Sequence, residues 1–231
     1  MVTANPRPLL VLTGVSRSYG SLQALKPVDL AVAAGQCIAL LGVNGSGKST
    51  LLRIASGRDT PSAGHVRYGG LPLQEDALVA RTEIAVVGDV SSTYPDLTVR
   101  EHLLLVAVAH GAGARAAGMV DSALAECRLD GHDMALPGSL SSGQRQALQL
   151  AAILVRPRRL LILDEPEQRL DPAARRWLAD LLAREKARGA AVLLATHHVE
   201  LAEAVADQAL VLLDGAVIGQ GTPEEALGSL R

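Results

Sequence analysis

The chain has 231 residues with 22 basic and 24 acidic side chains, so its formal net charge is −2. This length suits one large domain, or one domain with an inserted part, and the balanced charge argues against a general nucleic-acid binder. The apolar fraction of 48% excludes a disordered chain, although Phe is absent and the core must be built from Leu, Ala, Val and Ile.

Short apolar runs alternate with helical patterns along the chain. The runs typical of strands are Leu9–Leu12, Val28–Ala33, Cys37–Leu41, Leu160–Leu163, Ala191–Ala195 and Ala209–Leu213. The helical patterns are Ser49–Ala55, Glu101–His110, Arg115–Glu126, Gln144–Leu154, Pro172–Arg188 and Val199–Ala206. This alternation predicts an α/β fold with a mainly parallel sheet. Residues 89–140 interrupt it, so we expect an inserted helical subdomain there, between core residues 1–88 and 141–231 of a single domain.

The sequence shows neither a membrane-spanning run nor a signal segment. No apolar run reaches the ~20 residues that a membrane-spanning helix needs, and Met1–Pro8 is too polar for a signal segment. Cys37 and Cys127 lack the spacing of a metal site, so we expect two buried free thiols. The sequence therefore predicts an intracellular protein.

A phosphate-binding loop is the first motif that indicates chemistry. Residues 42–50 fit the pattern Gly-x4-Gly-Lys-Ser/Thr between a predicted strand and a predicted helix. Glycines let backbone N–H groups turn toward phosphates at a helix N-terminus, whose dipole favours anions. Lys48 would bring a positive charge to the β- and γ-phosphates, and the hydroxyl of Ser49 would be a ligand for Mg²⁺. The residues expected to bind ATP here are Gly42, Asn44, Gly45, Ser46, Gly47, Lys48, Ser49 and Thr50.

Two carboxylates follow the buried run Leu160–Leu163. Asp164 and Glu165 therefore emerge at the carboxyl end of a strand, where α/β sheets bind their ligands. Asp164 suits a contact to Mg²⁺ through water, and Glu165 is free to polarise an attacking water. An apolar run that ends in two acids is also an ordinary strand ending, but the phosphate loop upstream favours the catalytic interpretation.

The segment 140–144 reads Leu-Ser-Ser-Gly-Gln and opens a helical pattern. With the two motifs above, it resembles the ATP-binding cassette (ABC) family, whose Leu-Ser-Gly-Gly-Gln signature occupies this place. The resemblance covers essentially the whole chain. It implies a P-loop ATPase of ABC type, with a mainly parallel core sheet, an N-terminal antiparallel β subdomain and an inserted helical subdomain.

The resemblance also implies roles for residues outside the phosphate loop. Tyr19 would stack on adenine, and His197 would be the switch histidine that acts on the γ-phosphate with Lys48 and Glu165. Taken alone, Tyr19 would be an ordinary half-buried tyrosine, and His197 with its neighbour His198 would be a surface pair.

A head-to-tail dimer is the third implication of the resemblance. The residues that would contact the ATP of the opposite subunit are Ser141, Gly143, Gln144 and, in the interface loop, Asp171. ATP would join two cassettes, and hydrolysis would let them part. Each residue has a plainer alternative, since Ser141 suits a helix N-cap and Asp171 precedes Pro172 as at a helix start.

Two positions depart from the family pattern. Asp89 stands where a glutamine is expected before residues 94–101. It could still be a ligand of Mg²⁺, but an ionised Asp accepts hydrogen bonds only and adds negative charge. We therefore expect hydrolysis with altered metal dependence, unless the loop register differs and Asp89 is merely solvated. Ser142 replaces the first signature glycine, with a mild expected effect because Ser is tolerated at a helix start.

The leading functional hypothesis is the ATPase subunit of a membrane transporter. Residues 221–225 resemble the close of a minimal cassette, so we expect a permease on a separate chain that meets residues 94–104. We also expect export, a homo- or heterodimer of cassettes, ATP and Mg²⁺ as ligands, and a peripheral location on the inner face of the cell membrane. The alternatives are a soluble non-transport cassette that acts as an ATP-dependent dimer switch and, less favoured, an unrelated P-loop kinase.

Overall fold

The computed structural model describes residues 8–74, 78–88 and 93–228. The strands are β1 (Pro8–Tyr19), β2 (Leu22–Ala33), β3 (Cys37–Leu41), β4 (Ala63–Tyr68), β5 (Leu71–Pro72), β6 (Ile84–Val87), β7 (Leu160–Asp164), β8 (Ala191–Thr196), β9 (Gln208–Leu213) and β10 (Ala216–Gly221). The α-helices are α1 (Lys48–Ala55), α2 (Leu78–Glu83), α3 (Val99–Ala109), α4 (Ala116–Glu126), α5 (Ser142–Leu154), α6 (Pro172–Ala187), α7 (Val199–Val205) and α8 (Pro223–Gly228). Short 3-10 turns lie at Gly113–Arg115 and Pro137–Ser139.

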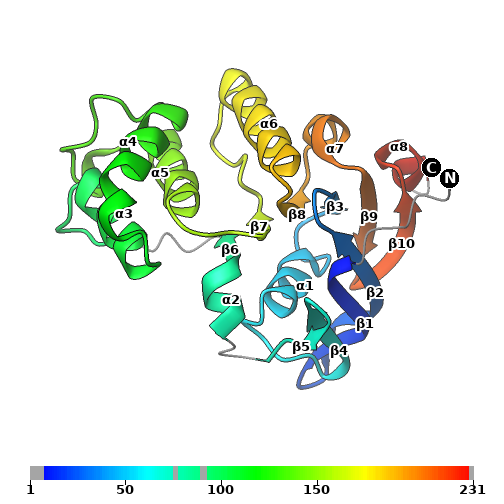
Figure 1. The fold of residues 1–231 in the computed structure, drawn as a ribbon. Coiled ribbons are helices and arrows are strands. Elements are labelled where there is room, and N and C mark those ends of the chain that lie inside the picture. Colours follow the sequence, from blue (N-terminus) through cyan, green and yellow to red (C-terminus); the bar gives the residue numbers. More distant parts are fainter. Residues whose placement is uncertain (1–7, 75–77, 89–92, 229–231) are drawn as a thin grey trace, which may run out of the picture.

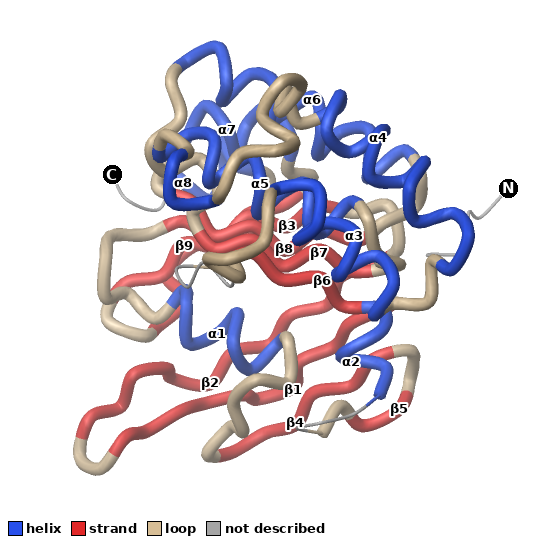
Figure 2. The backbone as a smooth tube through the Cα atoms, turned by 90° about the vertical axis from the view of Figure 1, so that its left-hand side faces the viewer, coloured by secondary structure: helices blue, strands red, loops and turns tan. Residues whose placement is uncertain are grey.

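Two sheets enclose helix α1. The larger sheet has the strand order β10-β9-β3-β8-β7-β6, and its pairs are parallel except for β9 with β10. The smaller sheet has the order β2-β1-β4-β5 and is antiparallel. Figure 2 shows α1 between the two sheets, and its buried Leu51, Leu52 and Ile54 belong to the core that both sheets share. The predicted α/β fold with an N-terminal antiparallel part is confirmed.

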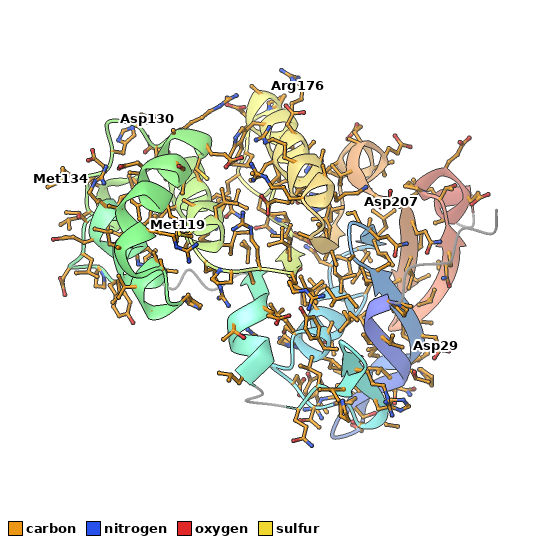
Figure 3. All side chains as sticks on the ribbon, in the orientation of Figure 1. Asp29, Met119, Asp130, Met134, Arg176 and Asp207 are labelled. Atoms are coloured by element: carbon orange, nitrogen blue, oxygen red, sulfur yellow. The ribbon has the colours of Figure 1, made fainter. Side chains whose placement is uncertain are left out.

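A second core lies on the opposite face of the larger sheet. It combines residues of the sheet with residues of α3, α4, α5 and α6, among them Leu103, Val120, Leu148 and Leu178. In Figure 1, α3, α4 and α5 gather at one side of the molecule, beyond β6 and β7. Met119, Asp130 and Met134 lie in this helical part, away from the sheets (Figure 3). Among the described residues between 93 and 140, helices and turns occur but no strand.

Helix α6 connects the helical part to the rest of the fold. Trp177 donates a hydrogen bond from its indole nitrogen to the carbonyl of Glu126, the last residue of α4, at 2.8 Å. The guanidinium of Arg184 lies 3.3 Å from the Glu126 carboxylate. The buried carboxylate of Glu185, also on α6, accepts hydrogen bonds from Arg158 and Arg188. These contacts fix α6 between the end of α4 and the loop that leads into β7.

Neither free cysteine is exposed, as predicted. Cys37 and Cys127 are both buried and form no disulfide. In the part of the chain that the structure describes, no helix has the length and hydropathy to cross a bilayer.

Candidate functional site

Three neighbouring parallel strands deliver the predicted motifs to one edge of the larger sheet. The phosphate loop follows β3, and β7 ends at Asp164 with Glu165 next to it. Strand β8 lies between β3 and β7 and leads to His197. The register pairs Leu41 with Thr196 and Asp164 with Ala195, so all three strands end at the same level. The carboxyl ends of strands in such sheets are where ligands bind.

Glycine is required at two positions of the phosphate loop. Gly42 has a φ of 151°, and a Cβ there would lie 2.4 Å from the carbonyl oxygen of Leu212. Gly47, at the N-cap of α1, has a φ of 105°, and a Cβ there would lie 2.9 Å from the carbonyl oxygen of Ala24. Any side chain would therefore displace backbone. The loop passes close to its neighbours.

The side chain of Lys48 is folded into the loop that precedes it. It is buried, and Nζ donates to the carbonyl oxygens of Gly42 at 2.7 Å and Val43 at 3.1 Å. Nζ also lies 3.6 Å from Oε1 of Glu165. The positive charge thus stands between the loop and the end of β7.

A cavity of about 310 Å³ opens at this point. Its walls include residues of the loop and of α1, namely Asn44, Gly45, Gly47, Lys48, Ser49 and Thr50. Asp164 and Glu165 form part of the same wall. The structure thus brings most of the predicted loop residues together with both carboxylates. Gly42 and Ser46 lie outside the cavity lining, and the side chain of Ser46 is buried behind the loop.

Glu165 is held in a strained backbone conformation. Its φ is 47°, uncommon for a residue with a side chain, and its N–H donates to the carbonyl of Ala195 on β8 at 2.9 Å. The carboxylate accepts a hydrogen bond from the amide of Gln168, and its Oε2 lies 3.5 Å from Nδ1 of His197. Such strain concentrates at functional sites because the surrounding structure has to maintain it. Contacts from β8, from the loop after β7 and from the loop after β8 therefore hold Glu165 in position.

Glu167 is a buried acid directly behind these residues. Its side chain accepts a hydrogen bond from the hydroxyl of Thr196, and that hydroxyl also accepts from the backbone N–H of His198 at 3.0 Å. Burial raises the pKa of Glu167, while the Thr196 hydrogen bond and the nearby histidines oppose that shift. The loop after β7 and the loop after β8 are thereby tied together.

The signature segment forms the N-terminus of α5. Ser141 is the N-cap, and its Oγ accepts from the N–H of Gln144 at 3.2 Å while Oε1 of Gln144 accepts from the N–H of Ser141 at 2.9 Å. The amide nitrogen of Gln144 lies 2.8 Å from Nε2 of His132. Gly143 is next to the loop after β7, since a Cβ there would lie 3.8 Å from the carbonyl oxygen of Arg169. Ser141 and Ser142 are exposed, Gly143 and Gln144 are half-buried, and none of them lines the 310 Å³ cavity.

Asp171 and Tyr19 both make contacts within the fold. Asp171 is the N-cap of α6 and accepts from the N–H of Ala174 at 2.8 Å. The hydroxyl of Tyr19 donates to Asp59 at 2.5 Å, and the guanidinium of Arg17 lies 4.5 Å from the ring centroid. Neither arrangement conflicts with a role in binding, because Asp171 is exposed and 40% of the surface of Tyr19 is accessible to solvent. Asp89 lies outside the described residues.

Three further residues of the site were not predicted from the sequence. Gln168 reaches Glu165 within the loop after β7, whereas Glu167 and Thr196 meet only because β7 and β8 are adjacent. Glu167 and Thr196 are 29 residues apart in sequence. Their only signal in the sequence is that they are polar residues at or shortly after the ends of the apolar runs Leu160–Leu163 and Ala191–Ala195.

The comparisons with known proteins point to one family. The sequence pattern described as ABC transporter matches residues 25–168. The Nod factor export ATP-binding protein I of Rhizobium etli is 36% identical over 94% of this chain and 69% of that protein. The protein of the same name from Paraburkholderia xenovorans is 37% identical over 97% of this chain and 74% of that protein.

Solved structures agree with these sequence relatives. The ATP-binding subunit of an ABC transporter superimposes with a TM-score of 0.84 at 33% identity, over 93% of this chain and 90% of that chain. A bacterial ABC transporter cassette, solved as a dimer, superimposes with a TM-score of 0.85 at 25% identity, over 93% of this chain and 98% of that chain.

Proposed function

Because the chain belongs to the ABC transporter family, we propose that it is the ATP-binding and ATP-hydrolysing subunit of an export transporter and drives a separate permease chain. The observation that carries the proposal is the cavity in which Lys48, Ser49, Asp164 and Glu165 meet. The cavity joins a loop suited to phosphates with a carboxylate suited to activating water.

The phosphates of ATP would lie along the phosphate loop. Backbone N–H groups at the start of α1 and the ammonium of Lys48 would attract them, and Tyr19 would stack on the adenine. The hydroxyl of Ser49 and the carboxylate of Asp164 both line the cavity and are the oxygen donors that Mg²⁺ prefers. Mg²⁺ bound there would neutralise charge that develops on the phosphates.

Glu165 would polarise the attacking water. General-base assistance of this kind contributes about 10²–10⁴ in rate. His197, 3.5 Å from the same carboxylate, is the residue that would contact the γ-phosphate. Gln168 would hold the carboxylate in place through its hydrogen bond to Oε2.

A second copy, or a related cassette, would complete the site. The N-terminus of α5 carries the exposed Ser141 and the half-buried Gly143 and Gln144, and such a terminus attracts anions. In a head-to-tail dimer it would face the γ-phosphate held by the other subunit, with Asp171 in the interface. Hydrolysis would remove the shared phosphate and release the pair.

The permease would meet the chain near residues 94–104. Tyr94 is exposed there, and α3 begins shortly after it at Val99. Export as the direction is supported by relatives whose names state export. The chain would then lie on the inner face of the cell membrane, bound to its partner.

Co-isolation tests the transport function against the soluble-switch alternative. We expect that affinity purification of the tagged chain from detergent extracts of the producing organism also recovers a polytopic membrane protein in stoichiometric amount. The Glu165→Gln variant, assayed in parallel for ATP-dependent dimerisation, reports on the ATPase mechanism independently of the permease. A chain that dimerises with ATP but never co-isolates with a membrane protein would support the non-transport alternative.

A further inference from the structure

A cluster of residues of the kinds that bind metal ions lies next to the carboxylate of Glu165. Glu167, His197 and His198 each place one ligand atom so that the three atoms lie within 4.8 Å of one another. Glu167 comes from the loop after β7, and the histidines come from the loop between β8 and α7. Among the described residues this is the one group of three or more His, Cys, Asp or Glu side chains with that spacing.

Glu167 carries an unsatisfied oxygen inside this cluster. The residue is 1% exposed, and the Thr196 hydroxyl occupies Oε1. Oε2 is buried and has no hydrogen-bond partner among the described residues. Leaving a buried carboxylate oxygen unpaired is costly, and an unfilled cation position is one of the recognised explanations.

The two histidine rings lie on the same side of the chain although they are consecutive. Their centroids are 4.4 Å apart with an interplanar angle of 37°. The backbone N–H of His198 is fixed by the hydroxyl of Thr196, which also binds Glu167. The hydrogen bonds that position His198 therefore also position the carboxylate.

Two charged groups border the cluster. Oε2 of Glu165 lies 3.5 Å from Nδ1 of His197, and a guanidinium nitrogen of Arg175 lies 3.0 Å from Nδ1 of His198. The carboxylate favours a cation at His197. The guanidinium opposes one at His198, so a metal ion would have to displace Arg175 from that ring.

We propose that Glu167, His197 and His198 form a binding site for a borderline divalent transition-metal ion, of which Zn²⁺ is the principal candidate. Two imidazoles and one carboxylate are a ligand set that Zn²⁺ uses with a fourth position open. Imidazole nitrogen does not suit Mg²⁺, which prefers oxygen. The site is thus chemically distinct from the one formed by Ser49 and Asp164.

Metal binding inhibits ATP hydrolysis, because His197 is then a ligand and cannot contact the γ-phosphate. This consequence rests on the proposed function, whereas the binding itself does not. Excess Mg²⁺ leaves the inhibition in place, since the metal does not compete for the Mg²⁺ position, whereas ATP opposes metal binding because both need His197.

Zn²⁺ binding to the untagged full-length protein, measured by competition with a chromogenic chelator, tests the site. His198→Ala and Glu167→Gln each remove one ligand and are expected to weaken binding at least about tenfold. His65→Ala, which removes an exposed histidine on β4, is the matched control and leaves the affinity unchanged. Arg175→Ala is expected to tighten binding, because it removes the competing guanidinium.

The ATPase assay distinguishes the site from its consequence. Zn²⁺ is expected to inhibit the wild type in excess Mg²⁺, more strongly at low than at high ATP concentration, and to spare His198→Ala, whose basal rate is unchanged. Thermal unfolding verifies that the variants are folded. If the wild type does not bind Zn²⁺, or both ligand variants bind it as the wild type does, the site is refuted. Binding without inhibition would overturn the role of His197 and leave the metal site standing.

Discussion

Nζ of Lys48 lies 3.6 Å from Oε1 of Glu165, with both side chains largely buried. The residue expected to hold phosphate and the residue expected to activate water are thus in contact across the cavity. Phosphates that enter the loop compete with this carboxylate for the ammonium. Nucleotide binding would then release Glu165 toward the water that it has to polarise.

Glu165→Gln is expected to lower the ATPase rate by at least about 100-fold while ATP binding persists. The amide keeps the size of the side chain but cannot accept the proton of the water. Phosphate release measures the rate, and light scattering with ATP measures a stable dimer. A variant that neither slows nor forms a longer-lived dimer would contradict the assignment of Glu165.

Gly47→Ala is expected to abolish ATP binding and to destabilise the fold. Its φ of 105° and the 2.9 Å approach to the carbonyl oxygen of Ala24 leave no room for a methyl group. Gly118→Ala, within helix α4, meets no atom within 4 Å and is the control. It should raise the free energy of unfolding by roughly 0.5–1 kcal/mol, because alanine suits a helix interior. Denaturant titration and nucleotide fluorescence measure the two effects, and equal behaviour of the variants would contradict the prediction.

Ser141→Ala and Thr98→Ala separate helix capping from dimer formation. Both residues form a capping box, at α5 and at α3 respectively. Each substitution should cost about 1 kcal/mol of unfolding free energy. ATP-dependent dimerisation of a Glu165→Gln background should fail only with Ser141→Ala. Equal dimerisation of the two variants would leave Ser141 with a capping role alone.

Glu185→Ala is expected to cost about 3–5 kcal/mol of stability, because it leaves Arg158 without its buried partner. Burial alone would raise the pKa of Glu185, but Arg158 and then Arg188 outweigh it and lower that pKa. The stabilisation is therefore complete above the unfolded-state pKa of about 4.3 and is lost as the pH falls through the lower folded-state pKa.

Unfolding free energies measured between pH 7 and pH 3 check this pH dependence. Glu185→Gln should lose less stability than the wild type on acidification, since its side chain does not titrate. Parallel curves for the two proteins would show that the carboxylate of Glu185 has no part in the acid sensitivity.

Cys37 and Cys127 should resist thiol reagents in the native state. Burial raises the pKa of Cys37 to about 12, and burial also raises that of Cys127. The thiolate is the reactive form, so neither residue reacts at pH 8. A chromogenic disulfide reagent should report no thiol in buffer and two after unfolding. Rapid labelling of the folded protein would contradict the buried placement.

The strands that carry the motifs were the predictable part of the fold. Cys37–Leu41 and Ala191–Ala195 are continuous apolar runs, because parallel strands covered on both faces need them. Ile84–Val87 is only four residues long, and Ala216–Gly221 contains two glycines, so neither pattern indicated a strand. Helix α2 is a six-residue segment without a detectable period.

The site was predictable where a motif is local and unpredictable where it depends on strand order. The phosphate loop and the pair Asp164–Glu165 follow directly from consecutive residues. The link from Glu167 to Thr196 exists only because β7 pairs with β8, and no local pattern specifies that pairing. The contact between Trp177 and Glu126 was unpredictable as well, because it depends on how α6 packs against α4.

The contact of Trp177 gives this protein an optical property of its own. It is the only tryptophan of the chain, and its indole nitrogen binds the last residue of α4 from a position on α6. Light at 295 nm therefore excites a single chromophore at the junction between the helical part and the sheets. Any rotation that separates α4 from α6 breaks that hydrogen bond and admits water, so the emission spectrum of the unlabelled protein reports the motion directly.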